Sequence, residues 1–132
     1  MRCELIQGNP DQSLGFTGYE LLTELAKRQL SLKQSVILDS VATTESIRVL
    51  WQDLANQYGG EWRVIECICS DESLHRKRLE GRQRDIPGWH ELQWSEVDGV
   101  KSYYASWSEP RLVLDAVNSF EMNFLSAVQY CR

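Results

Sequence analysis

A cluster of cations gives this sequence its clearest capacity for chemistry on phosphate. Arg76, Lys77, Arg78, Arg82 and Arg84 place five of the chain's 14 lysines and arginines within nine residues. At helical spacing Arg78 and Arg82 are i, i+4 neighbours on one face, so their guanidinium groups can converge on phosphate oxygens. Arginines placed in this way can stabilise a phosphoryl group during transfer. A helix C-terminus rich in cations, which interact favourably with the helix dipole, explains the same residues equally well.

One carboxylate, Asp39, adds a second candidate group. It follows the apolar run 36–38, and we expect it at the carboxyl end of a buried strand. Ligands of open parallel sheets bind beyond such strand ends, where Ser40, the turn 69–71 and Asp115 are also expected. A carboxylate there can hold Mg²⁺, or its bound waters, against the phosphates of a nucleotide. The alternative interpretation is an aspartate that caps the turn after the strand.

The composition limits which classes of protein these residues can belong to. The chain has 132 residues, of which 42% are hydrophobic and 25% charged, which excludes disordered and fibrous proteins and suits one domain with its own core. A net charge of −5 argues against a general nucleic-acid-binding surface, so any phosphate site must be local. No apolar run approaches the ~20 residues of a membrane span. With no signal-peptide stretch and no secreted pattern of cysteines, we expect a cytoplasmic protein with free thiols.

The apolar periodicity predicts helices and strands in alternation. In chain order these are a helix over 18–33, a strand over 35–40, a helix from 43 or 44 to 58, a strand over 62–69, a helix over 71–83, a helix over 97–107, a strand over 111–115 and a helix from 119 onwards. Thr17 and Asn118 are the predicted N-caps of the first and last helices, because a glutamate follows each three residues later. Alternation of this kind implies crossovers onto a parallel sheet. We therefore predict an α/β fold in which helices cover both faces of a parallel sheet.

With Asp39 and the basic cluster in this order within the predicted α/β pattern, the chain resembles the P-loop kinase-like ATPases of the zeta-toxin and nucleoside-kinase type. The resemblance runs through 35–40 (the Walker B strand), 63–72 (the next strand, leading into the lid), 78–82 (the lid arginines), 88–91, and 111–115 (the last strand). It covers about residues 17–132.

The resemblance implies ATP and Mg²⁺ as ligands, and transfer of a phosphoryl group to a small acceptor. It implies that Asp39 lies near the metal with Ser40 beside the nucleotide, and that Arg78, Arg82 and Arg84 close over the phosphates. Arg78 and Arg82 would be the catalytic residues among these. The expected partners are a nucleotide and a small-molecule acceptor, with no nucleic acid and no membrane, and a homo-oligomer is compatible with the sequence.

The sequence departs from this family in lacking its phosphate-binding loop. That loop reads G-x-x-x-x-G-K-[ST], and its backbone amides and lysine hold the phosphates. Lys101 is followed by a serine, but Val100 stands where the motif requires glycine. We therefore expect residues 1–132 to form a single partial domain without its first strand, phosphate loop and first helix, with impaired activity or none. A truncated product, a partner that supplies the missing element and a degenerate relative all remain as explanations.

A non-catalytic module is the alternative from a different class. The same sheet would then bind a protein or a small anion, or would assemble with another copy through its unprotected edge.

Cysteine and histidine side chains supply further candidates for chemistry. Cys67, Cys69, His75 and His90 are of the types that bind zinc. On a strand the two thiols point to the same face of an apolar run, so buried inert cysteines are the simpler interpretation. The sequence shows no environment that would activate a cysteine nucleophile.

Two other groups have a structural and a functional interpretation. The segment Trp89-His90-Glu91 is either a substrate-facing part of the lid or a loop on which Trp89 packs. Glu66 interrupts an apolar strand, and we expect it to need a partner such as an arginine. Tyr104 and Trp107 stand at helical spacing and are predicted as core residues rather than as a platform for bases.

Overall fold

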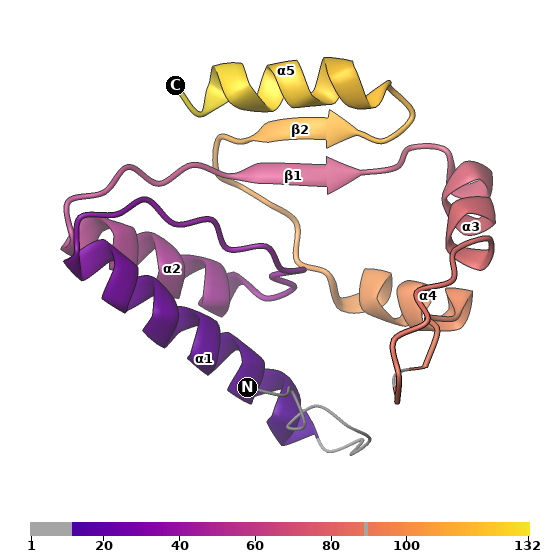
Figure 1. Cartoon of the computed structure of the whole chain (residues 1–132), viewed down its shortest axis with the longest axis horizontal. Helices are drawn as coiled ribbons and strands as arrows, with labels where there is room; N and C mark the ends of the chain where they lie inside the picture. The colour runs from indigo at the N-terminus through magenta and orange to yellow at the C-terminus, as the bar shows by residue number, and fades with distance from the viewer. Residues whose placement is uncertain (1–11, 89) are drawn as a thin grey trace. The chain divides into compact units, whose positions relative to one another are not determined.

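The computed structural model describes residues 12–88 and 90–132, which form five helices and two strands (Figure 1). The elements are α1 (Gln12–Ser31), α2 (Glu45–Gln57), β1 (Ile65–Ile68), α3 (Glu72–Glu80), α4 (Trp94–Tyr103), β2 (Leu112–Asp115) and α5 (Phe120–Tyr130). The chain divides into two compact units, one of residues 1–62 with 86–90 and one of residues 63–85 with 91–132. The first unit therefore contains α1 and α2, and the second contains both strands and the other three helices.

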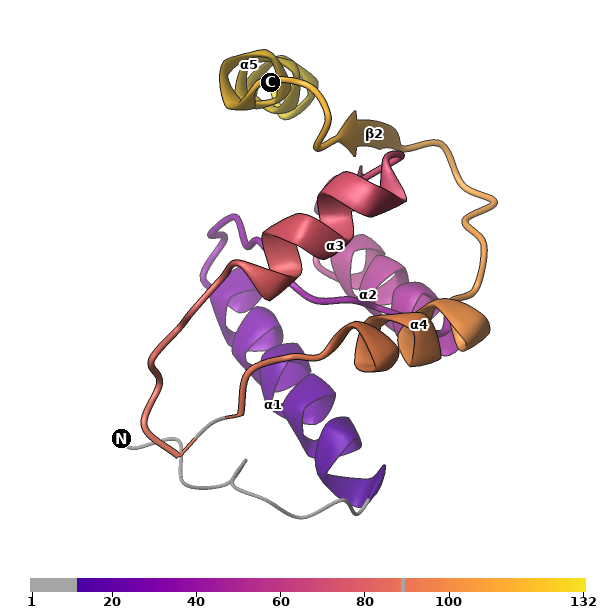
Figure 2. The ribbon, with the colours of Figure 1, turned by 90° about the vertical axis from the view of Figure 1, so that its right-hand side faces the viewer.

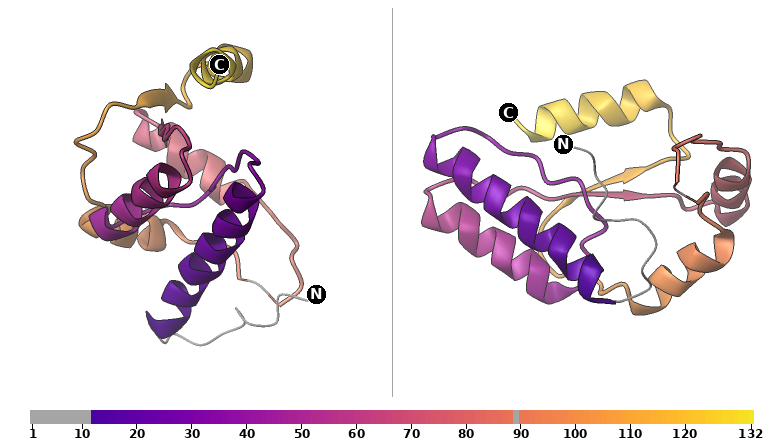
Figure 3. Two further views of the ribbon diagram at one scale, coloured as in Figure 1. Left: turned by 90° about the vertical axis from the view of Figure 1, so that its left-hand side faces the viewer. Right: turned by 60° about the horizontal axis from the view of Figure 1, so that its bottom comes forward.

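Helices α1 and α2 lie side by side in the first unit (Figure 3). The apolar stripe predicted for α2 is confirmed at Trp51, Leu54 and Ala55, which are buried. The Trp51 indole Nε1 donates a 2.9 Å hydrogen bond to Oγ1 of Thr23, a buried residue of α1. This contact satisfies two polar groups that burial would otherwise leave without water. Gly59 follows α2 with a φ of +70°, a backbone conformation that favours glycine and ends the helix.

Helix α1 differs from its prediction at both ends. It begins at Gln12, so Thr17 lies inside the helix and is not its N-cap. A capping motif is a local preference, and helical propagation through 12–16 overrides it. The helix ends at Ser31 because Lys33 takes a left-handed φ of 60°. The Lys33 and Gln34 N–H groups then donate to the carbonyls of Leu30 and Gln29, which closes the helix with a Schellman motif.

Strands β1 and β2 form a parallel pair in the second unit (Figure 1). Their register runs from Ile65 opposite Leu112 to Ile68 opposite Asp115. Helices α3 and α4 lie between the strands in sequence, and α5 packs along β2. The predicted α/β fold with a parallel sheet is therefore confirmed.

The predicted strand over 35–40 is wrong. Residues 34–39 have no regular secondary structure, and Ile37 is 92% exposed. A strand needs a neighbour for its backbone hydrogen bonds, and in the described residues β1 and β2 pair only with each other. Local apolarity therefore favoured an extended segment but could not supply a partner for it.

Helix α5 begins one residue later than predicted. Its N-cap is Ser119, whose Oγ accepts the Met122 N–H at 3.3 Å. Asn118, the predicted cap, instead donates its backbone N–H to the carbonyl of Asp115 in the turn after β2. Serine and asparagine both cap helices well, so the position of the cap is set by the turn after β2, which includes Asn118.

Helix α4 spans 94–103 rather than 97–107, which leaves Trp107 outside it. Among the described residues, no helix combines the length and the apolar character that crossing a bilayer requires.

Candidate functional site

The carboxyl end of β1 leads into α3 through a well-defined cap. Asp71 is the N-cap of α3, and its Oδ1 accepts the Leu74 N–H at 2.9 Å and the Ser73 hydroxyl at 2.7 Å. These hydrogen bonds, first that from Leu74 and then that from Ser73, hold the pKa of Asp71 below its usual range. The cap fixes where the arginine-bearing helix starts relative to the strand.

Asp115 closes the same edge of the sheet at the end of β2. Its Oδ1 accepts the backbone N–H groups of Ser70 and Val117, each at 3.1 Å. Hydrogen bonds from Ser70 and then from Val117 hold the pKa of Asp115 below its usual range. This carboxylate therefore joins the two turns that follow β1 and β2.

Arg78 extends from α3 to this sheet edge. Its Nη1 donates a 2.7 Å hydrogen bond to the carbonyl of Ala116, the residue that follows β2. The side chain is exposed, and its other guanidinium nitrogens make no hydrogen bond within the described residues. Arg78 is thus anchored through one nitrogen and retains further N–H donors for an anion.

Arg82 and Arg84 lie beyond α3, so the expectation that Arg78 and Arg82 share one helical face is wrong. The helix ends at Glu80 because Gly81 follows, and glycine is a poor helix former. Arg82 is exposed, and its side chain has no hydrogen-bond partner among the described residues. Arg84 instead braces the loop, since its backbone N–H donates to Glu91 Oε1 at 2.7 Å. Its buried Nε lies 3.9 Å from Glu91 Oε2 without a hydrogen bond.

A hollow of about 570 Å³ adjoins these arginines in the second unit. It is lined from α3 and its end by Arg76, Glu80 and Arg82, and from the 91–95 segment and α4 by Glu91 and Asp98 among others. Figure 2 shows α3 and α4, the helices that contribute to its walls. The hollow contains both signs of charge.

Trp94 organises the contact between α3 and α4, and no motif or spacing in the sequence singles this residue out. Its ring meets the His75 ring edge to face, with centroids 5.2 Å apart. Lys101 Nζ lies 4.5 Å and the Arg76 guanidinium 5.9 Å from the centroid of the indole. Lys101 also pairs with Glu72 at 3.2 Å, so cations and an indole join the two helices.

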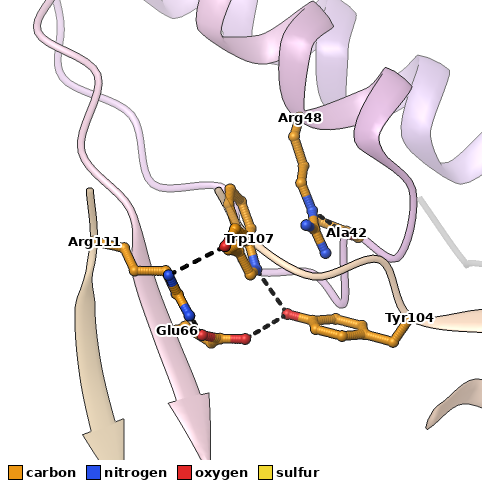
Figure 4. Close-up of polar contacts among 6 residues, drawn as sticks. All are labelled: Ala42, Arg48, Glu66, Tyr104, Trp107 and Arg111. Atoms are coloured by element: carbon orange, nitrogen blue, oxygen red, sulfur yellow. Dashed lines mark hydrogen bonds and ion pairs between the residues drawn. The ribbon is translucent and has the colours of Figure 1, made fainter. Parts of the chain in front are cut away.

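Asp39 and Ser40 belong to the first unit, in the irregular segment before α2. Asp39 is exposed, whereas the Ser40 hydroxyl is buried without a hydrogen-bond partner in the described structure. Ala42 takes a left-handed φ of 45°, which is costly for a residue other than glycine. The buried Arg48 of α2, which sequence reasoning missed, holds this backbone by donating from Nε to the Ala42 carbonyl at 2.8 Å (Figure 4).

An exposed carboxylate beside an unsatisfied hydroxyl fits hydrated Mg²⁺. This ion keeps several waters and takes one or two carboxylates together with substrate phosphates. Within residues 12–88 and 90–132 no three His, Cys, Asp or Glu side chains gather closely enough to hold a metal ion by themselves. Asp39 and Ser40 therefore suit an ion that arrives with phosphates rather than a protein-only metal centre.

The cysteine and histidine candidates do not form such a centre either. Cys67 is exposed, so the expectation of a buried thiol is wrong for it, and Cys69 is half-buried, with its Sγ directed to the carbonyl of Asp71 at 3.3 Å. His75 is committed to the Trp94 contact. Trp89 lies outside the described residues.

Glu66 has the arginine partner that the sequence predicted (Figure 4). Arg111 Nε donates to Glu66 Oε2 at 2.6 Å, and the Tyr104 hydroxyl donates to Oε1 at 3.2 Å. The Trp107 indole donates in turn to the Tyr104 oxygen at 2.8 Å. Tyr104 and Trp107 therefore serve a polar network around a strand carboxylate, rather than the apolar core expected for them.

Comparison with known proteins identifies the family. A family model described as "AAA domain" matches residues 4–104, which is more than half of the chain. The chain belongs to the AAA domain family. At this coarse level the predicted relationship to the nucleotide-binding, kinase-like P-loop NTPase family is confirmed. The AAA-domain match contains the 35–40 segment together with Arg78, Arg82 and Arg84, and it ends before β2. No curated protein and no solved structure matches the chain significantly.

Proposed function

We propose that this AAA-domain protein is a kinase-like protein of the zeta-toxin and nucleoside-kinase type, which binds ATP with Mg²⁺ and directs phosphate to a small acceptor. The observation that carries the proposal is the anchoring of Arg78 at the carboxyl edge of the sheet, with unpaired Arg82 nearby in sequence. Ligands of parallel sheets bind at this edge, and guanidinium groups with free N–H donors recognise phosphate oxygens.

Arg78 and Arg82 have separate tasks in this proposal. Arg78 is held in place by the Ala116 carbonyl, so it can orient a phosphate at little cost in side-chain entropy. Arg82 is free to move onto the phosphate after the nucleotide arrives. Arg84, which is engaged with Glu91, positions the loop that carries Arg82 and contributes charge to the same region.

Asp39 and Ser40 are the residues that would hold the hydrated Mg²⁺. When bound, MgATP supplies the phosphoryl group, which passes to an acceptor hydroxyl as the bond to the β–γ bridging oxygen breaks, releasing ADP and a proton to solvent. The 132 residues contain no G-x-x-x-x-G-K-[ST] motif. We therefore expect weak ATP binding and little or no transfer from this part of a P-loop kinase-like domain. The free thiols of Cys67, Cys69 and Cys131 suit a cytoplasmic location.

Calorimetric titration with ATP, with and without Mg²⁺, tests this proposal. We expect saturable binding that needs Mg²⁺ and that weakens about tenfold in Arg82→Ala, the loss of one charge-assisted contact. Lys77→Ala removes the same charge from α3 and is the matched control, with unchanged binding expected. No binding by a chain that circular dichroism shows to be folded, or an equal loss in Lys77→Ala, would contradict the proposal.

An oligomerising module is the second candidate, and exposed apolar groups favour it. A two-stranded sheet leaves both outer edges unpaired within the described residues, and such edges accept further strands. The stacked rings of Phe120 and Phe124 are 76% and 54% exposed. A second copy is the proposed occupant, because residues 35–40 are an apolar, unpaired segment in the same chain that can add to such an edge.

Sedimentation equilibrium over a range of concentrations tests this candidate. Self-association should weaken in Ile37→Asp and persist in Val49→Asp, which places the same charge at an exposed position on α2. A monomer at every concentration would exclude it.

A further inference from the structure

We propose that the hollow between α3 and α4 binds a small molecule that carries hydroxyl groups and a protonated amine but no phosphate, in the manner of an amino sugar. This molecule would be the phosphoryl acceptor, so that part of the inference rests on the proposed function. The hollow, at about 570 Å³, is of the size that proteins use for small ligands.

The charges in the hollow separate into those already paired and those left for a ligand. Arg76 Nε and Glu80 Oε1 form an ion pair at 2.7 Å, and Glu91 Oε1 accepts the Arg84 N–H. Asp98 makes no hydrogen bond or ion pair within the described residues, and neither does the side chain of Arg82. The Asp98 carboxylate, whose charge also acts on Arg76, and the Arg82 guanidinium group therefore keep their hydrogen-bonding atoms for a ligand.

An acceptor that carries a phosphate of its own does not suit this lining. Arg82 would face the phosphate, but Asp98, which has no hydrogen-bond or ion-pair partner within the described residues, lines the same space, and Glu80 and Glu91 line it as paired carboxylates. Repulsion by these like charges disfavours a dianion, whereas the same carboxylates accept hydrogen bonds from an ammonium group and from hydroxyl groups.

Nucleobases do not suit the lining either. Trp94 is the aromatic residue that lines the hollow, and a base would need a face of its indole for stacking. Lys101 and Arg76 already lie over this ring, and His75 contacts it edge to face. A ligand that reaches the hollow therefore meets charged and amide side chains, with Leu79 and Leu92 beside them, rather than a free stacking surface.

Arg82 connects the hollow to phosphate chemistry. It lines the hollow and is also the unpaired arginine that we assign to the transferred phosphate. An acceptor seated beside Asp98 would thus be held next to the group that stabilises the phosphoryl during transfer.

Titration of the full chain with D-glucosamine, in the absence of ATP, tests the inference. Chemical shifts of the tryptophan indole N–H and of the α3 and α4 amides report the binding. We expect saturable binding by glucosamine, with affinity about tenfold weaker for glucose, which lacks the amine, and for glucosamine 6-phosphate. Asp98→Asn should weaken glucosamine binding about tenfold. Asp85→Asn is the matched control on the loop after α3, and it should leave binding unchanged.

The outcomes separate this inference from the proposed function. Tighter binding of glucosamine 6-phosphate than of glucosamine, or equal binding by Asp98→Asn, would overturn the amine-selective hollow. An absence of shifts in the α3 and α4 amides would overturn it as well. If ATP fails to bind but Asp98-dependent glucosamine binding persists, the acceptor role falls together with the proposed function, and the amine selectivity stands.

Discussion

Replacing Glu66 by glutamine should cost far more stability than the same replacement at Glu80. Both carboxylates pair with an arginine Nε at nearly the same distance, 2.6 Å to Arg111 and 2.7 Å to Arg76. They differ in exposure, because the Glu66 side chain is 13% exposed and that of Glu80 is 56% exposed. The comparison therefore measures what burial does to one kind of ion pair.

The structure sets the expected size of each effect. Glu66 accepts hydrogen bonds from Arg111 and Tyr104. Glutamine keeps the shape, but its amide NH2 cannot accept a hydrogen bond, so one of the two bonds is lost and the other loses the charge of its acceptor, at a cost of about 1 kcal/mol each. We expect Glu66→Gln to lower the free energy of unfolding by about 2 kcal/mol. Glu80→Gln removes an exposed i, i+4 pair worth about 0.3–0.5 kcal/mol.

Urea denaturation followed by far-UV circular dichroism measures both variants. A double-mutant cycle with Arg111→Met then isolates the Glu66–Arg111 coupling from the separate effect of each substitution. Equal losses in Glu66→Gln and Glu80→Gln, or a coupling energy near zero, would refute the reasoning from burial.

Three further predictions concern single contacts. The pKa of Asp115 is lowered in the folded chain, so its contribution to stability is complete above about pH 4 and is lost as the pH falls through the folded pKa; the urea midpoints of wild type and Asp115→Asn should therefore converge in acid. Thr23→Val removes the acceptor of the Trp51 indole and should cost about 1–2 kcal/mol in a urea melt, and no change would mean that this buried bond adds nothing. Ser119→Ala should cost about 1 kcal/mol and Asn118→Ala much less, and the reverse order of midpoints would restore Asn118 as the cap of α5.

Local sequence signals predicted the elements whose stability is local. Helix α2 could be predicted because three local signals indicate the same helix. These are its apolar stripe, Thr44 at its start and Gly59 after its end. Glu66 could be assigned an arginine partner because a carboxylate inside an apolar strand needs compensation, although only the fold shows that the partner is Arg111.

The predictions that were wrong concern features that depend on contacts between residues distant in sequence, or on the residue at which a helix ends. The 35–40 segment has the composition of a strand, but a strand exists only where another strand pairs with it. The shared face of Arg78 and Arg82 required a helix through residue 82, and Gly81 ends it first. Arg48 acts through a backbone carbonyl, and Trp94 acts through the cations that lie over its indole. No rule of sequence spacing predicts either contact.

Helices α3 and α4 depend on contacts that dissolved salt weakens. Neither helix has a buried residue, whereas α2 buries Trp51, Leu54 and Ala55. Lys101 joins them through Glu72 and through the Trp94 ring, both electrostatic contacts at the surface. Local opening takes least free energy where little apolar surface is buried, so the amides of α3 and α4 should exchange with deuterium before those of α2. Mobile ions screen such charges over about 10 Å at 0.1 M. Ionic strength therefore controls how often the arginine-bearing helix separates from its neighbour, whereas the apolar contacts that hold α2 are not screened by salt.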